Sequence, residues 1–338
     1  PFTAIKAERT KSYESGLRLR LFSKYNAEVT YYKSNTYNQT FLGNLPESTG
    51  YNSIYLQAGN VENRGWEASF GYSDRFKNGF SISSTLTFSK NINEIKEMVK
   101  DYNTEVMGVP VSINIPEVLK DKGRTILKEG GSIHDIYATR FFKKDSQGYV
   151  LVSSDGKYEM EDGDPVYLGK TAPDFNMGWN NAISYKGFGL SFLINGRFGG
   201  VVTSSTEAIL DRYGVSQRTA DARESEGALF PGQGRVDAKT YYQMIGTGNY
   251  QTSGYYVYSA TNIRLQELTF SYTMPNKWFG NVLKDVSVSF IANNPWMLYC
   301  KAPFDPELTP STATYGQGND YFMQPSVRSF GFGLKFKL

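Results

Sequence analysis

The last ten residues of the chain, Ser329 to Leu338, alternate without a break between large apolar side chains and small or charged ones. Phe330, Phe332 and Leu334 fall on one face, whereas glycine, serine and lysine residues fall on the other. A period of two residues is the signature of a β-strand. A soluble β-sandwich also alternates, so both classes of protein stay open. A face of large apolar residues opposite a small and cationic face favours a strand between lipid and a watery lumen.

The same alternation recurs along the chain and predicts an all-β fold. In the fourth stretch, 80–91, one face is nearly all serine and threonine, which suits a lumen wall better than a sheet that is buried on both sides. We therefore expect about nine antiparallel strands of a transmembrane β-barrel, at about 14–23, 27–43, 61–74, 80–91, 174–186, 188–201, 260–274, 285–297 and 326–338.

The connections between these strands alternate strictly between short turns and long loops. The long loops are predicted at 44–60, 92–170, 203–259 and 298–325, with strand-like pieces at 133–143 and 148–153 and a short helix near 206–212. Short turns on one rim and long loops on the other are typical of outer-membrane barrels. Aromatic residues beside the short turns predict a girdle at the periplasmic interface: Tyr25, Phe76, Tyr185, Trp278 and Phe279.

An odd number of strands would leave open edges, whereas bacterial barrels close with an even number. The chain also starts Pro1-Phe2-Thr3, without an initiator methionine or a signal-like segment. We therefore expect the whole chain, 1–338, to be the C-terminal portion of a larger barrel, or a mature chain cut from a longer one.

Composition narrows the function without identifying it. The net charge of +3, from 36 basic and 33 acidic residues, is too small to argue for nucleic acid. Mean hydropathy is −0.44 and no apolar run has the length of a spanning helix, yet barrel strands turn half of their residues toward water. Aromatic residues make up 15% of the chain, which suits interfacial girdles and ligand contacts.

The single cysteine, Cys300, excludes an internal disulfide framework, and the single histidine, His134, excludes a multi-histidine metal site. No catalytic constellation is present, so we expect neither an enzyme nor a cofactor.

Several motifs, in order from about residue 13 to the end, resemble those of the SusC/RagA-type TonB-dependent outer-membrane transporters of Bacteroidetes. They include Glu129 to Tyr137 (EGGSIHDIY), Gly59 to Glu67 (GNVENRGWE), Leu210 to Ser216 (LDRYGVS) and Asp305 to Glu307 (DPE). His134 stands where the family has glycine, and the closing residue is leucine rather than the usual aromatic.

The resemblance implies a 22-stranded barrel with an N-terminal plug, of which this chain supplies roughly strands 14 to 22. It implies active import of a large nutrient, an oligosaccharide or an oligopeptide, driven by TonB. It also implies a SusD-like surface lipoprotein over the extracellular mouth, in a dimer of such pairs. The plug and the TonB-contacting segment are not part of this chain. A passive porin-like or structural barrel and a soluble carbohydrate-binding β protein are the alternatives.

Aromatic residues of the long loops are the candidates for contact with substrate or with the lipoprotein, because aromatic faces stack on sugars and contact peptides. Packing of loop on loop is the competing interpretation. The candidates are Tyr241, Tyr242, Tyr250, Tyr255, Tyr256, Trp296, Tyr299, Tyr315, Tyr321 and Phe322.

Charged residues offer three weaker candidates. Inward-facing cations could line the lumen, although pairing with acids of the plug is favoured: Arg18, Arg20, Arg264, Lys335 and Lys337. Clustered carboxylates could bind calcium, although a solvated loop is favoured because their spacing fits no defined calcium loop: Glu159, Glu161, Asp162 and Asp164. For His134 beside Asp135, a structural role is favoured over a proton relay.

Overall fold

The computed structural model describes residues 6–44, 53–98, 101–106, 109–114, 120–121, 125–154, 158–230, 234–247, 254–280, 282–308 and 317–337. No helix among these residues is long and apolar enough to cross a membrane.

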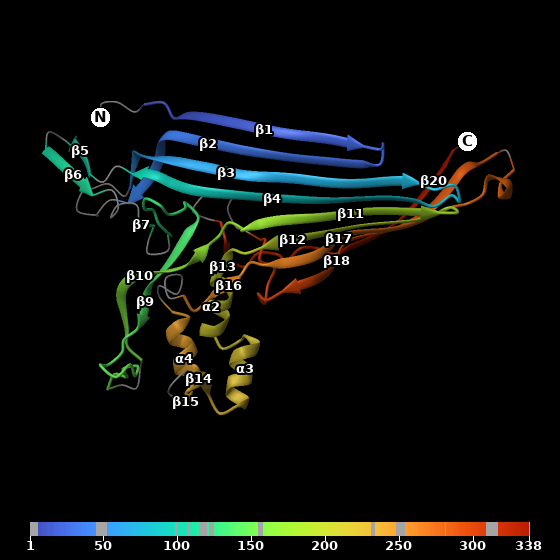
Figure 1. The fold of residues 1–338 in the computed structure, drawn as a ribbon. Helices are drawn as coiled ribbons and strands as arrows, with labels where there is room; N and C mark the ends of the chain where they lie inside the picture. The colour runs from blue at the N-terminus through green and yellow to red at the C-terminus, as the bar shows by residue number, and fades with distance from the viewer. Residues whose placement is uncertain are drawn as a thin grey trace.

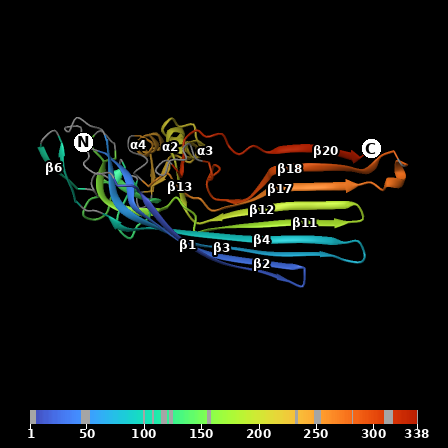
Figure 2. The ribbon, with the colours of Figure 1, turned by 90° about the horizontal axis from the view of Figure 1, so that it is seen from above.

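One large antiparallel sheet dominates the molecule, and it confirms the expectation of about nine main strands (Figure 1). Its strands follow one another in chain order and curve into a trough when seen from above (Figure 2). In the described part of the chain the sheet is open, with β1 and β20 at its edges. The strands are β1 (Arg9–Leu21), β2 (Tyr25–Asn44), β3 (Ser53–Arg75), β4 (Ser81–Met98), β11 (Phe175–Tyr185), β12 (Phe188–Phe198), β17 (Asn262–Thr273), β18 (Lys284–Cys300) and β20 (Ser329–Lys337).

The strands nearest the N-terminus are longer than the sequence pattern indicated. Residues 53–60 belong to β3 rather than to a loop over 44–60, and β4 continues to Met98. The β2–β3 register runs on to the pair Asn44 and Ser53. Backbone hydrogen bonds along an existing hairpin extend it despite glycine and asparagine, whose poor strand propensity is a weak effect.

One face of the sheet, here called the outer face, is apolar, and the other, the inner face, is polar. Residues can be assigned to a face because cross-strand partners point to the same side of a sheet. Phe290 pairs with Phe332 on one side and Phe270 on the other, all on the outer face. Ser289 pairs with Gly333 and Ser271 on the inner face. Phe332 is 85% exposed, so the apolar side chains of this sheet point away from the rest of the protein.

The short turns lie toward the right-hand end of Figure 1, and the sequence places aromatic residues beside them. The structure places Tyr25, Phe76, Tyr185 and Trp278 there as exposed side chains. Rings of neighbouring turns approach one another, with 6.5 Å between the centroids of Phe80 and Tyr185.

The opposite end carries the long connections, which fold into a compact loop unit in both ribbon views. We use this name for residues 135–259 without the hairpin β11–β12. It contains β9 (Asp135–Phe142), β10 (Met160–Lys170), β13 (Val201–Ser204), α2 (Ser205–Arg212), α3 (Gln217–Glu224), β14 (Ala228–Phe230), β15 (Gly234–Val236), α4 (Ala238–Ile245) and β16 (Val257–Ser259). β19 (Asn319–Asp320) joins its sheet, and β5 (Asp101–Val106), β6 (Val109–Asn114), β7 (Lys120–Asp121) and β8 (Thr125–Ile126) form two separate hairpins.

Local sequence explains why the helices of the loop unit start where they do. The side chains of Ser204, Ser216 and Asp237 cap α2, α3 and α4, each accepting a hydrogen bond from a backbone N–H three residues further on. Each helix has only eight residues, too few to be stable alone. Packing around Phe142 and Phe230 therefore stabilises α2 and α4, and packing of Ala222 against Ala228 and Ala238 stabilises α3.

Candidate functional site

The inner face of the sheet carries a hollow of about 600 Å³ toward its long-loop end. Strands β2, β3, β4, β11, β12 and β17 all contribute side chains to it. Most of the residues that line it are polar, with carboxylates from β2 and β3 and guanidinium groups from β12 and β17, although Ala68, Phe88 and Met177 also line it. The polar residues are Glu28, Thr30, Glu67, Ser69, Thr87, Ser89, Asn176, Asn195, Arg197, Arg264, Gln266 and Glu307.

A second hollow of about 670 Å³ lies on the same face toward the short turns. Serine and threonine residues supply eight of its 17 lining residues, among them Ser81, Ser83, Ser184 and Ser191. The Oγ atoms of Ser81 and Ser184 lie 2.6 Å apart across two strands. The serine and threonine face of the fourth strand therefore belongs to the inner wall.

Arg197, at the end of β12, has spare hydrogen-bonding capacity in the first hollow. One terminal N–H donates to the carbonyl oxygen of Thr171. Its Nε is buried and has no hydrogen-bond partner among the described residues. A guanidinium donates up to five hydrogen bonds, so Arg197 retains donors for an acceptor from outside this chain.

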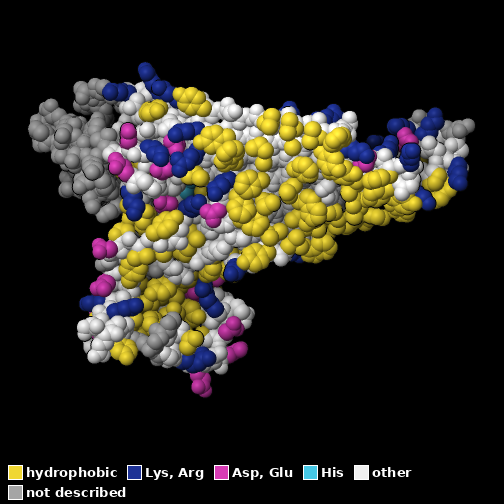
Figure 3. Space-filling view, viewed as in Figure 1, with side chains coloured by type: hydrophobic (Ala, Val, Ile, Leu, Met, Phe, Trp, Pro, Cys, Tyr) yellow, Lys and Arg dark blue, Asp and Glu magenta, His cyan; other side chains and the backbone are white. Residues whose placement is uncertain are grey.

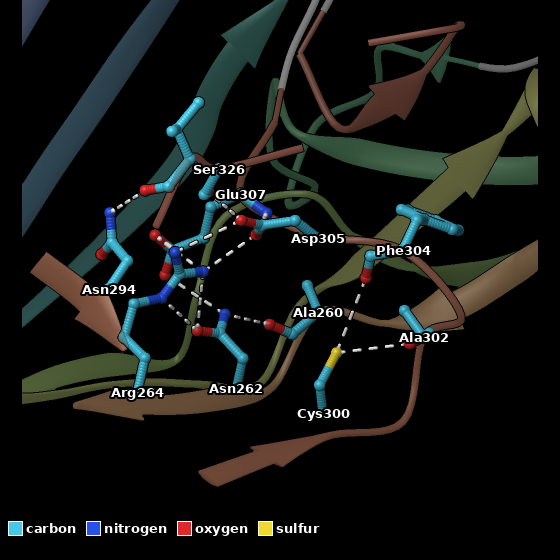
Figure 4. Close-up of polar contacts among 11 residues, drawn as sticks. Ala260, Asn262, Arg264, Asn294, Cys300, Ala302, Phe304, Asp305, Glu307 and Ser326 are labelled. Atoms are coloured by element: carbon cyan, nitrogen blue, oxygen red, sulfur yellow. Dashed lines mark hydrogen bonds and ion pairs between the residues drawn. The ribbon is translucent and has the colours of Figure 1, made fainter. Parts of the chain in front are cut away.

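Arg264, also on the wall, is instead held by residues of its own chain (Figure 4). Its Nη2 and Nη1 lie 2.9 and 3.3 Å from the two carboxylate oxygens of Asp305. Asn262 accepts from the same guanidinium and donates to Glu307 at 3.1 Å. Ser326 donates to Asp305. We call Arg264, Asn262, Asp305, Glu307 and Ser326 the Arg264 node. Its contacts hold the segment after β18 next to the start of β17.

The node keeps Asp305 ionised. Burial alone would raise the pKa of Asp305, but hydrogen bonds from Arg264 and Ser326 outweigh burial and hold the pKa below its ordinary value. A bidentate arginine–carboxylate pair with such support is among the strongest polar contacts in proteins.

Three of the five inward cations have ion-pair partners within this chain, whereas their pairing with acids of a plug stays a prediction. Arg264 pairs with Asp305, Arg18 donates to Glu28 on the neighbouring strand at 2.7 Å, and Lys337 reaches Asp285 at 2.7 Å. Strand pairing sets these partners side by side, which the sequence of one strand cannot reveal. Arg20 and Lys335 share the inner face with them through the strand alternation.

Four of the aromatic candidates lie inside the loop unit rather than at an open surface. Tyr241, Tyr242 and Tyr255 pack against a core formed by Phe142, Phe230 and other buried residues, and Tyr256 belongs to that core. Phe142 lies 5.2 Å from Tyr255 between ring centroids. The structure thus places them where the competing interpretation, loop-on-loop packing, expected them.

Tyr256 also belongs to a buried polar network. Its hydroxyl donates to Asp211 at 3.0 Å, and Asp211 accepts from Ser216 at 2.6 Å and from Arg218 at 2.9 Å. Burial, and then the charge of Asp211, raise the pKa of Tyr256. Burial likewise raises the pKa of Tyr255. These tyrosines are neutral structural groups.

The remaining described candidates are exposed. Tyr321 and Phe322 are exposed and 5.5 Å apart, beside α2, where Thr206 accepts from the N–H of Phe322. Trp296 and Tyr299 pair with Leu265 and Ile263, on the outer face of the sheet and not in the hollow. Tyr250 and Tyr315 lie outside the described residues.

The segment with the EGGS motif contacts the inner wall. Asn93 of β4 accepts from the Ser132 hydroxyl and the Ile133 N–H, and Asp135 accepts from the Ser132 N–H. His134 is partly buried, and burial lowers its pKa. Its Nδ1 has no hydrogen-bond partner among the described residues. The contacts give this segment a structural role.

The acidic cluster lies partly in a strand. β10 begins at Met160, so Glu161 to Asp164 belong to a strand rather than to a loop, and Glu161 and Asp164 are exposed to solvent as predicted. Glu159 pairs with Lys143 at 3.2 Å. Among the described residues, no group of three or more potential metal ligands comes together.

Sequence reasoning missed the importance of Arg197, Asn262 and Asp305. Asp305 stood inside a motif, but nothing in the sequence separated a donor with spare capacity, such as Arg197, from a residue that is fully bonded. Asp305 could have been identified as a candidate partner of Arg264. It is an acidic residue in the loop before the closing strand, and Arg264 is an arginine on the inner face of β17.

Comparison with known proteins shows which proteins this chain is similar to. Residues 1–126 match the family model described as TonB dependent receptor-like, beta-barrel. TonB-dependent receptor P3 of Formosa agariphila is 26% identical over 357 residues, covering 98% of this chain and 34% of the relative. TonB-dependent receptor SusC of Bacteroides thetaiotaomicron is 23% identical over 353 residues, covering 98% and 32%.

Among solved structures, the RagAB peptide importer in its closed-closed state matches with a TM-score of 0.67 at 17% identity. The match covers 97% of this chain and 35% of that one. Its open-open state gives the same TM-score. This chain thus spans about a third of the length of the relatives it matches, and the structural likeness establishes the fold.

Proposed function

We propose that the chain is a member of the TonB-dependent receptor β-barrel family of the outer membrane and forms part of the wall of an active nutrient importer. Its likeness to that family model and to curated TonB-dependent receptors supports this. The cargo is a large nutrient, an oligosaccharide or an oligopeptide. TonB supplies the energy, a SusD-like surface lipoprotein covers the mouth, and two such pairs form a dimer. No catalytic step on the cargo is part of this proposal.

The observation that carries the proposal is the polar hollow on the inner wall. An apolar outer face and a hydrophilic inner face are the arrangement of a barrel that conducts a water-soluble cargo. The hollow sets carboxylates of β2 and β3 against guanidinium groups of β12 and β17. Arg197 has donors to spare there for hydroxyl, carbonyl or carboxylate oxygens.

The loop unit supports the proposed partner. It lies at the long-loop end, which is extracellular in barrels of this kind. Tyr213, Val215 and Leu229 are exposed on it, and Tyr321 and Phe322 are exposed beside it. Exposed apolar groups grouped on one unit are typical of a surface that binds another protein. We propose that the lipoprotein contacts this unit.

Uptake by cells that carry the full-length protein tests the proposal. We expect uptake of oligosaccharide or oligopeptide mixtures to be lost when TonB is deleted and to fall several-fold with Arg197→Gln. Arg20→Gln, on the inner face near the short turns, is the matched control and should leave uptake unchanged. Uptake that persists without TonB would instead establish the passive porin-like barrel.

A pull-down of the full-length protein from outer membranes tests the partner. We expect a surface lipoprotein to co-purify, and less of it after Leu229→Glu than after the control Leu229→Ala. Recovery of the barrel without any lipoprotein would contradict this part of the proposal.

A further inference from the structure

A cluster of charged residues lies on the outer face of β1 to β4, next to the apolar band of the sheet. Figure 3 shows basic side chains, with a few acidic ones, gathered at the long-loop end of these strands where the hydrophobic surface stops. Charged groups on the lipid-facing side of a barrel are costly unless they lie at the level of the headgroups. Their position therefore needs an explanation.

The strand register places this cluster on the outer face. Trp66 pairs with Tyr31 and Lys90, in the same alternation as Phe70. Two residues further along β3, Arg64 pairs with Lys33. Cross-strand partners point to the same side of a sheet, so these cations share the outer face with the aromatic band.

Two carboxylates hold three of the cations together. The Glu62 side chain is only 3% exposed and contacts Lys33 at 2.8 Å and Lys96 at 3.8 Å, as well as Arg64. Glu94 contacts Lys96 at 2.7 Å and Arg64 at 3.2 Å. The three cations remain partly exposed around these acids. They are thus fixed in place without being removed from solvent.

Positive charge is in excess, because two further lysines lie on the same face. Lys90 pairs with Trp66, and Lys11 pairs with Asn35 with its Nζ 5.7 Å from the ring centroid of Tyr37. Neither lysine forms an ion pair with another residue in the described part of the chain. Glu97, which pairs with Asn60, is a third carboxylate on this face. Five cations therefore share the face with three carboxylates among the described residues, and the positive excess favours an anion.

The depth of the cluster matches the headgroup level of the membrane. On β2, eight residues separate Tyr25, beside a short turn, from Lys33, roughly 27 Å along the strand. A strand tilt of about 40° reduces this to a height of roughly 20 Å, close to the ~25 Å of a lipid-facing band. The long-loop end is the extracellular end, so the cluster lies at the outer leaflet.

We propose that Lys11, Lys33, Arg64, Lys90 and Lys96 bind the phosphate group of an outer-leaflet lipid. Arginine binds phosphate through a planar fork of donors, and lysine adds a mobile point charge. Basic clusters beside a hydrophobic span recognise anionic headgroups. The tyrosine and tryptophan rings below the cluster lie level with the acyl chains. The inference rests on the orientation of the sheet in the membrane and not on the cargo.

Binding of purified full-length protein in detergent to a phosphorylated lipid A and to its dephosphorylated form tests this proposal. The variant Lys11→Gln with Lys90→Gln removes the two cations without disturbing the contacts of Glu62. Lys77→Gln with Lys277→Gln, at the short-turn end, makes the same change in net charge and serves as control. Shifted mobility of the unheated barrel on gels verifies folding of every variant.

We expect the phosphorylated lipid to bind about fivefold more weakly for each lysine removed, or about 25-fold for both. The control variant should bind as the unmodified protein does. Equal loss in both variants, or loss in neither, would overturn the site. Equal binding of the dephosphorylated lipid would overturn phosphate recognition. If inorganic phosphate displaced the lipid at equal concentration, the proposal that the bound phosphate group belongs to a lipid would be overturned.

Discussion

The sheet and the loop unit use the same aromatic residues in opposite ways. In the sheet, Phe332 is 85% exposed and faces away from the protein, whereas in the loop unit Phe142 is 5% exposed and lies among other rings. Serine behaves inversely. It lines the inner wall of the sheet, yet Ser204 and Ser216 are buried helix caps in the loop unit.

The difference shows that each region is folded against a different solvent. A loop unit surrounded by water buries its apolar groups, because the hydrophobic effect rewards their removal from water. A sheet with lipid on one side and water on the other is not stabilised by apolar side chains on its inner face. Its backbone N–H and C=O groups form their hydrogen bonds with neighbouring strands. The contrast can be tested by making the same kind of change on both sides.

The largest effect is expected from emptying the core of the loop unit. Phe142→Ala should cost about 3–5 kcal/mol of local stability, because it leaves a cavity among Phe230, Tyr241 and Tyr255. Phe332→Ala on the lipid face should cost less than ~1 kcal/mol, since lipid fills the space. Urea-dependent proteolysis of the long loops in the full-length barrel measures the stability cost of Phe142→Ala. Equilibrium unfolding in lipid vesicles measures the stability cost of Phe332→Ala. Equal costs would contradict the two-solvent account.

A charge placed on either side of one strand sharpens the comparison. Leu190 faces outward and Ser191 inward on β12. Leu190→Lys should cost about 2–4 kcal/mol if it lies near the middle of the bilayer, whereas Ser191→Lys should cost ~1 kcal/mol or less in the watery lumen. Equilibrium unfolding in lipid vesicles measures both. A costlier inner substitution would reverse the assignment of the faces.

A smaller effect is expected from one buried hydroxyl in the loop unit. Tyr256→Phe removes the hydrogen bond to Asp211 and should cost about 1.5–3 kcal/mol of local stability. Tyr321→Phe, at an exposed ring, is the control and should be neutral. Hydrogen exchange over α2 and β16 reports the change. Unaltered exchange in the Tyr256 variant would show that Ser216 and Arg218 satisfy Asp211 without the tyrosine.

The smallest effect concerns pH and the EGGS segment. The pKa of His134 in the folded segment lies below its ordinary value, because burial disfavours the charged ring. As the pH falls through about 6.5, the unfolded segment therefore binds a proton more readily than the folded one, and stability drops. Hydrogen exchange of residues 130–136, corrected for intrinsic rates, should rise from pH 7.5 to 5.5. His134→Gln should abolish that rise, and a rise that persists in the variant would assign it to another group.

The strands could be predicted from the sequence because alternation is a local property. Phe330, Phe332 and Leu334 share a face whatever their neighbours are, and a sheet with a uniform face on each side repeats that signal in every strand. The ends of β3 and β4 could not be predicted, since pairing between strands extends them beyond the residues that favour a strand.

The candidate site was predicted less well than the fold. Arg264 was recognised as inward-facing, but its partner Asp305 lies 41 residues further along the chain. The loop tyrosines were recognised as candidates for contacts, yet burial decides whether an aromatic ring packs or binds. Burial depends on which loops meet at the end of the sheet.

The sequence by itself determined the period of two, the polar face and the apolar face, and the order of short and long connections. The tertiary structure alone decided that Tyr256 lies inside a core, that Arg197 keeps free donors, and that five cations of β1 to β4 meet above an aromatic band. The physical reason is the distance along the chain between the residues that interact. Strand alternation depends on adjacent residues, whereas burial, ion pairing and charge balance depend on groups that only the register of the sheet and the packing of the loops bring together.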